Sequence, residues 1–212
     1  TLPPERRQSL HPAHLGSTYL RVLTSPIFLF STAALALNFC GFFIYVLSAP
    51  VFLMQHLGIP ETGFLWLFGP AMGGLMLGSW IAGHLASKRT PAATIAFGYV
   101  AMAGAALLNL GIALALPPGL PWSIAPLFVY TLGMALAMPS LTLFALDPFP
   151  HQRGTAASCQ TFLQSGFNSL VAGLVAPAVW RSTLTLATAM VVFVALGAIA
   201  TVLYHRSTRV PG

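Results

Sequence analysis

Three side-chain amides recur at helical spacing in one apolar stretch of the chain. Gln160, Gln164 and Asn168 are each four residues apart, so in an α-helix they share one face. An amide in hydrocarbon is costly unless it is hydrogen-bonded, and such a row therefore faces other helices or a water-filled cavity. The row predicts one of two roles: hydrogen bonds that hold helices together, or the lining of a path for amphipathic molecules.

A second set combines an amide with aromatic rings. Asn38, Phe42 and Tyr45 fall at positions i, i+4 and i+7, beside Phe39 and Phe43. Rings bind amphipathic or aromatic molecules by stacking and desolvation, without rigid hydrogen-bond requirements. The same rings are suited to packing against helices or lipid, so both interpretations stay open. Weaker candidates in the stretch 123–146 are Tyr130, Ser140 and Phe144.

The residues that support catalysis or metal binding elsewhere are not arranged for it in this sequence. The histidines lack zinc-ligand spacing, and there is no G-x-S-x-G, no P-loop and no pair of carboxylates. Cys40 and Cys159 lie in apolar stretches and are typical of small packing residues. We therefore expect no enzyme activity, no cofactor and no metal site.

These candidates must be positioned by membrane-spanning helices. Only nine Lys or Arg and three Asp or Glu occur in 212 residues, and 57% of the residues are hydrophobic, which excludes an ordinary soluble domain. The charges leave uncharged runs at 22–60, 62–87, 90–146, 154–180 and 182–205, each long enough to cross a bilayer. The run 90–146 divides at the proline-rich segment 116–122.

The expected fold class is therefore all-α, a polytopic membrane protein with six transmembrane helices. The predicted spans are about 26–50, 63–85, 92–116, 123–146, 155–178 and 183–205. The span 63–85 carries two consecutive G-x-x-x-G pairs, 69/73 and 74/78, which predict tight packing or a sliding interface. The spans 92–116 and 183–205 hold few polar side chains, and we expect them to be outer helices that face lipid.

The basic residues indicate the orientation in the membrane. Eight of the nine Lys and Arg residues fall on one side of the six spans, and Arg181 alone falls on the other. By the positive-inside rule the crowded side is cytoplasmic, so both termini are expected there. We expect a cytoplasmic connecting loop at 1–24, a six-helix bundle at 25–206 and a cytoplasmic tail at 207–212. Loop positions and anionic headgroups explain the net charge of +6, so nucleic acid is not an expected partner.

The predicted spans contain no central carboxylate, lysine or arginine, because Glu61 and Asp147 lie at span ends. Transport driven by a proton or sodium gradient commonly requires such a group inside the membrane. The chain alone is therefore poorly equipped to couple cargo to an ion gradient. Its polar, proline-rich opening without an initial Met is typical of a connecting loop, and we expect a fragment of a longer protein.

Several motifs resemble a known transporter family. The opening segment 1–6 (TLPPER), the segment 83–89 (GHLASKR) and the six-helix pattern together resemble the C-terminal half of a major facilitator superfamily transporter. The segments 45–50 (YVLSAP) and 145–160 (ALDPFPHQRGTAASCQ) more narrowly resemble its Bcr/CflA-type drug-efflux branch. The family's cytoplasmic loop motif is matched at Gly83, Leu85 and Lys88, with Arg89 as a further basic residue. Ser87 stands where the family has a carboxylate.

The resemblance implies a twelve-helix drug:proton antiporter of the bacterial inner membrane, of which these spans would be the seventh to the twelfth. In such transporters two six-helix halves, each made of inverted three-helix repeats, rock about a cavity at the middle of the membrane. The implied partners are protons, a small drug-like molecule, the lipid bilayer and an N-terminal six-helix half. That half would carry the acid that binds the proton.

The sequence therefore predicts export of small amphipathic or drug-like compounds by alternating access, in exchange for protons. The residues expected to line the substrate cavity are Asn38, Phe42, Tyr45, Tyr130, Ser140, Gln160, Gln164 and Asn168. Two alternatives are a half-transporter that dimerises to form its own pathway, and a membrane scaffold or receptor-like bundle that transports nothing.

Overall fold

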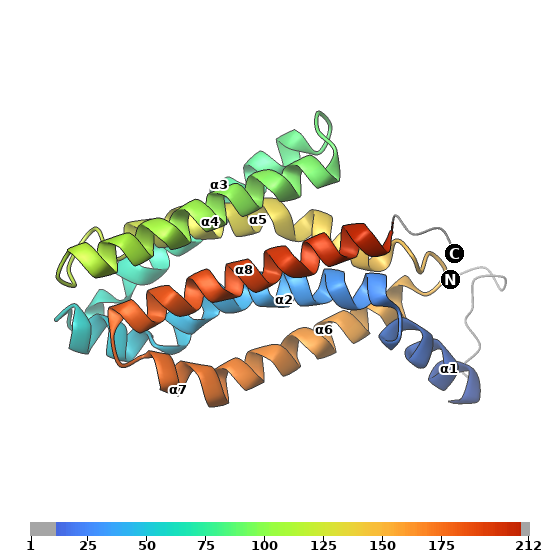
Figure 1. Cartoon of the computed structure of the whole chain (residues 1–212), viewed down its shortest axis with the longest axis horizontal. Coiled ribbons are helices and arrows are strands. Elements are labelled where there is room, and N and C mark those ends of the chain that lie inside the picture. The colour runs from blue at the N-terminus through green and yellow to red at the C-terminus, as the bar shows by residue number, and fades with distance from the viewer. Residues whose placement is uncertain (1–11, 209–212) are drawn as a thin grey trace.

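The computed structural model describes residues 12–208, which form helices that run side by side along one long axis (Figure 1). Six of these helical segments are long and apolar enough to cross a membrane: Pro26–Leu47, Thr62–Leu85, Pro91–Ala115, Ala125–Leu146, Arg153–Val179 and Thr183–Ser207. Residues 12–208 contain no strand. The predicted all-α fold with six membrane spans is therefore confirmed.

The spans are made of long helices extended by short irregular turns. The long helices are α2 (Pro26–Leu47), α3 (Leu65–Leu85), α4 (Pro91–Ala115), α5 (Ala125–Leu146), α6 (Arg153–Leu170) and α8 (Thr183–Ser207). The short segments are η2 (Val51–His56), η3 (Glu61–Phe64), η4 (Val171–Val175) and α7 (Ala176–Val179). α2 and α4 each begin at a proline that follows a capping residue, Ser25 or Thr90, whose hydroxyl accepts a backbone N–H of the first turn.

One further helix, α1 (Pro12–Leu23), precedes the spans and lies within the segment 1–24, which we expected to be a connecting loop. It packs mainly on α6. Figure 1 shows α1 and the end of α8 at the same end of the bundle, as an even number of spans requires. We refer to this end as the α1 end. A small apolar cluster there, which includes Val22, Phe28, Phe149 and Cys159, connects α1, α2 and α6.

The spans form a closed ring of four helices with two flanking helices. α2 packs on α5, α5 on α4, α4 on α8, and α8 on α2, whereas α3 packs on the outside of α5 and α6 packs mainly on α2. The least buried spans are the two flanking ones, with 22% of the apolar window buried in the α3 span and 11% in the α6 span. α4 and α8, expected to be the outer helices, are more buried than either flank. Small residues such as Gly98 of α4 and Gly197 of α8 let these two helices pack closely within the ring.

Glycines set the distance between α5 and its neighbours. A Cβ added at Gly98 of α4 would lie 2.6 Å from the carbonyl oxygen of Gly133 in α5, and the converse distance is the same. Gly74 and Gly78 of α3 similarly lie against backbone oxygens of α5. These contacts allow backbone to touch backbone, the usual arrangement where helices associate in lipid.

The two G-x-x-x-G pairs of α3 differ in what they contact. Only the 74/78 pair makes the close approach to α5. A Cβ at Gly73 would reach ordinary contact distance from the Phe128 ring, at 3.4 Å, and one at Gly69 would meet only its own helix. The pattern therefore indicates tight packing through one pair.

We predict that Gly98→Ala destabilises the protein by about 1–3 kcal/mol, because the new methyl group collides with backbone that cannot rotate away. Gly104→Ala in the same helix is the matched control, since a Cβ there meets no atom within 4 Å. Thermal unfolding of the detergent-solubilised protein measures both. Equal melting temperatures for the two variants would show that the α4–α5 contact is not the constraint inferred here.

Candidate functional site

The ring holds a hydrogen-bonded group, which we call the polar core: the buried residues Asn38, Tyr130 and Thr201 and the half-buried Tyr99. The Asn38 side-chain amide donates to the Tyr99 hydroxyl at 2.9 Å, and that hydroxyl lies 2.8 Å from the Thr201 hydroxyl. The Tyr130 hydroxyl donates to the backbone carbonyl of Asn38 at 2.8 Å. One residue of α2 is thereby bonded to α4, α5 and, through Tyr99, α8.

The polar core has room because two glycines lie where side chains would obstruct it. A Cβ at Gly41 would collide with the Tyr130 hydroxyl, and one at Gly197 would collide with the Asn38 side-chain oxygen. That oxygen, fully buried, has no hydrogen-bond partner within residues 12–208. The polar core therefore satisfies most of its groups internally and keeps one acceptor unpaired.

A second buried pair lies further along α2, away from the α1 end. The Asn109 amide of α4 donates to the Tyr45 hydroxyl, and the Tyr45 ring packs edge-on against Phe52 with 5.3 Å between ring centroids. Tyr45 is 1% exposed, and Phe42 and Asn109 are each 4% exposed. Of the predicted cavity residues, Asn38, Phe42, Tyr45 and Tyr130 thus lie in the closed interior of the ring.

The amides of α6 occupy a different environment. The α6 row, defined as Gln160, Gln164 and Asn168, passes from a buried position at Gln160 to half-buried positions at Gln164 and Asn168. The side-chain oxygen of Asn168 accepts a hydrogen bond from the Cys40 thiol of α2, with 3.6 Å between sulfur and oxygen. The Gln160 and Gln164 amides have no hydrogen-bond partner in the described part of the chain. Two amides are therefore free to bond something else.

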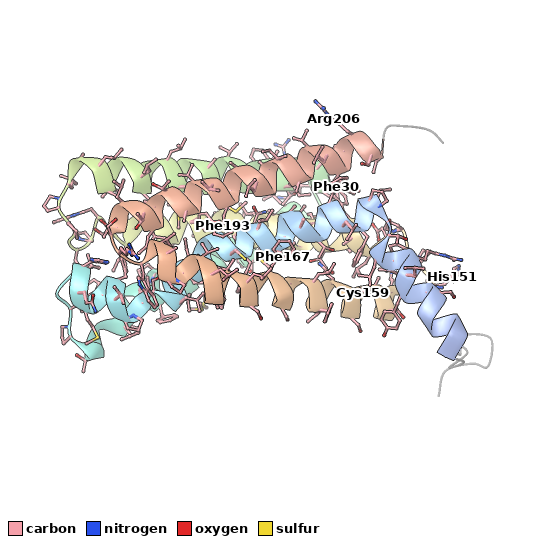
Figure 2. The ribbon with its side chains drawn as sticks, turned by 60° about the horizontal axis from the view of Figure 1, so that its bottom comes forward. Phe30, His151, Cys159, Phe167, Phe193 and Arg206 are labelled. Atoms are coloured by element: carbon pink, nitrogen blue, oxygen red, sulfur yellow. The ribbon has the colours of Figure 1, made fainter. Side chains whose placement is uncertain are left out.

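Aromatic side chains occur on both helices of the α2–α6 contact. Phe39 and Phe43 of α2 are half-buried and stacked, with 5.3 Å between ring centroids. Phe167 of α6 packs partly against the main core, and Figure 2 shows it on the stretch of α6 that runs alongside α2. These rings and free amides together provide apolar contact area and adaptable hydrogen bonding, the combination that suits amphipathic small molecules.

The α6 span is attached through α2 at the α1 end and through η2, the segment that follows α2, at the other end, in addition to the bond between Cys40 and Asn168. At the α1 end the apolar cluster around Phe28 holds it, with Phe28 and Phe149 packed edge-on at 6.0 Å between centroids. At the other end the His56 imidazole Nε2 lies 2.8 Å from the Trp180 carbonyl oxygen. The stretch with the free amides lies between these attachments.

The predicted cytoplasmic loop motif lies where α3 meets α4. Gly83 and Leu85 are in the last turn of α3, whereas Lys88 and Arg89 are exposed in the loop that follows. Ser140 of α5, another predicted cavity residue, lines a cavity together with Gly83 and Arg89, and no residue of the α6 row is among the residues that line it. The predicted cavity residues therefore lie in three places: inside the ring, along α6, and at the cavity that Ser140 lines.

Sequence reasoning missed three members of the buried network. Tyr99, Asn109 and Thr201 lie in the spans that were expected to face lipid, yet each bonds a side chain inside the ring. The available signal was the isolation of a tyrosine and an amide in otherwise apolar spans, because lone polar groups in hydrocarbon require partners.

Comparison with known proteins places this chain in context. Residues 1–172 match the model of the Major Facilitator Superfamily. The chain is 28% identical over 141 residues to Multidrug resistance protein MdtM of Salmonella typhimurium (strain LT2), covering 66% of this chain and 34% of that protein. Its identity to Multidrug resistance protein MdtM of Escherichia coli O157:H7 is 26%, with the same coverage. The chain thus matches about a third of the length of these curated relatives.

We predict that Tyr99→Phe destabilises the folded protein by about 1 kcal/mol, because the Asn38 amide loses its acceptor in a dry environment. Tyr204→Phe is the control, since it removes a hydroxyl from the same type of ring and keeps the Tyr204 stack on Phe144. Denaturation in mixed micelles compares the two variants. If Tyr204→Phe is the more damaging, the polar core does not tie the ring together.

Proposed function

Because the chain belongs to the major facilitator superfamily it is a membrane transporter, not an enzyme, and we propose that it forms one six-helix half of a drug exporter of the Bcr/CflA type. The exported compounds are small, amphipathic and drug-like. The two relatives named as multidrug resistance proteins support this class of substrate. The segments 45–50 and 145–160 support the narrower branch.

The α6 row is the main structural support for this proposal. Two of its three amides have no partner in the described chain, and the α6 span is the least buried of the six. Stacked Phe39 and Phe43 lie on α2, the helix against which α6 packs. A helix with unpaired amides is unfavourable in lipid and favourable beside an aqueous substrate path, where water and cargo supply the missing hydrogen bonds.

The partner in this proposal is a second six-helix unit. α3 and α6 leave broad faces uncovered, and the curated relatives extend well beyond the matched stretch. An N-terminal half packed on α3 and α6 would close the substrate path on its open side. The alternative occupant is a second copy of this chain, which would make a dimeric half-transporter. Family membership disfavours a scaffold that transports nothing.

The driving ion in this proposal is the proton, bound by the other half. The described carboxylate Asp147 lies at the end of α5, not at the middle of the membrane, and pairs with Arg153 at 2.9 Å. The positive-inside bias supports cytoplasmic termini in a bacterial inner membrane, with Arg181 on the outer side. Alternating access would then move the four-helix ring as one body, because the polar core and the glycine contacts join its helices.

The α6 row gives the test of transport. We predict that Gln164→Ala changes the efflux of individual dyes in a panel such as ethidium and other amphipathic cations by about two- to tenfold, the equivalent of one hydrogen bond. Some dyes lose more than others, and the amount of protein in the membrane stays unchanged. Dye accumulation in cells that express each variant measures the effect.

Ser165→Ala is the matched control, because Ser165 is the adjacent residue on α6 and is exposed. It leaves the dye profile as in the original protein. An equal loss for every dye, in proportion to a loss of protein from the membrane, would contradict a substrate-lining role for Gln164 and identify it as a packing residue.

A further inference from the structure

A cavity of about 380 Å³ lies between α3, α4 and α5 at the α1 end of the bundle. Its body is mainly apolar, with walls that include Ala82, Gly83, Leu136, Pro139 and Leu143. The α6 row does not contribute to it. The cavity is therefore separate from the substrate path proposed above.

The space between α3 and α4 forms one side of the cavity. Both helices pack on α5 but make few contacts with each other, so a molecule in the bilayer would enter the cavity between them, on the side that the second six-helix unit proposed above must leave free. Large apolar side chains next to the lining residues are exposed: Trp80, which follows the lining residue Ser79 in α3, is 62% exposed, and Phe97, three residues after the lining residue Thr94 in α4, is 50% exposed. Exposed aromatic rings near span ends are typical of the level at which headgroups meet acyl chains. Lipid is consequently the molecule with the most direct access.

The mouth of the cavity is positively charged. Arg89 lines the cavity, and its guanidinium has no ion pair or hydrogen bond within residues 12–208. Lys88 is adjacent and exposed. No carboxylate is among the lining residues, and Asp147 is engaged by Arg153. An uncompensated guanidinium above an apolar chamber favours a ligand with a negative head and an apolar body.

Ser140 adds a polar group deeper in the cavity. It is 9% exposed, it lines the cavity, and its hydroxyl has no hydrogen-bond partner in the described chain. Serine in a helix commonly bonds its own backbone, so an unpaired hydroxyl at the wall is available as a donor. A glycerol ester oxygen, which lies just below the phosphate of a phospholipid, is an acceptor of the required type.

We propose that this cavity binds an anionic phospholipid, with its phosphate at Arg89, its ester region beside Ser140 and an acyl chain between α3 and α4. The Arg89 side chain recognises the phosphate as a charge-assisted hydrogen-bond donor. The apolar wall selects an amphiphile over a soluble anion, since burying a free phosphate there would leave most of its oxygens unpaired.

Native mass spectrometry of the full-length protein tests this site, with phosphatidylglycerol and phosphatidylcholine as probes. Phosphatidylcholine has the same phosphate and chains but no net charge. We expect the protein to retain phosphatidylglycerol about tenfold more strongly, and Arg89→Gln to remove about that factor, as loss of one charge-assisted hydrogen bond would. Arg206→Gln, which removes an exposed charge at the end of α8, is the control and keeps the preference.

Gly83→Leu is the second variant, because a Cβ at Gly83 meets no atom within 4 Å and the added side chain can occupy the cavity without moving the backbone. It should abolish retention of the lipid while size-exclusion profiles stay unchanged. Equal retention of both lipids, or unchanged binding in Arg89→Gln and Gly83→Leu, overturns the proposal. Displacement of the lipid by millimolar inorganic phosphate also overturns it, in favour of a soluble-anion site.

Discussion

Polar groups in hydrocarbon need hydrogen-bond partners, and in this bundle that constraint centres on Asn38. Its side chain and its carbonyl receive or make hydrogen bonds with Tyr99 and Tyr130, and Tyr99 passes the connection on to Thr201. Without partners these groups would oppose insertion of α2 at its centre. With them, α2, α4, α5 and α8 become one ring, and the glycines at positions 41 and 197 provide the space in which the bonds form.

The same requirement distinguishes the ring, whose polar groups are mostly paired, from the two flanking helices. α3 and α6 attach to the ring from outside, and neither is needed to complete the polar core. α6 accordingly keeps unpaired amides at Gln160 and Gln164, whereas within the polar core only the side-chain oxygen of Asn38 is unpaired. In the transport model the ring supplies rigidity, and α6 supplies the adaptable contacts. The α3–α4 opening gives lipid a place at the edge of the rigid part.

The positions of the spans could be predicted from sequence because length, hydropathy and charge are local properties. The proline-rich segment 116–122 lies between α4, which ends at Ala115, and α5, which begins at Ala125. Which neighbour a polar side chain faces is not local. The bonds of Asn38 to Tyr99 and of Asn109 to Tyr45 join residues 61 and 64 positions apart, and a helical repeat says only that residues share a face. The assignment of Asn38 and Tyr45 to a substrate cavity remains a prediction, and their burial favours packing.

The transport proposal depends most on the α6 row facing an aqueous path rather than lipid. Cysteine accessibility tests it, in full-length protein with Cys40 and Cys159 replaced by alanine. Gln164→Cys should react with a membrane-impermeant thiol reagent, and an exported dye should slow the reaction. Gly104→Cys, on the exposed outer face of α4, should stay unlabelled because the thiolate does not form in lipid. Labelling of Gln164→Cys no faster than that of Gly104→Cys would contradict the account.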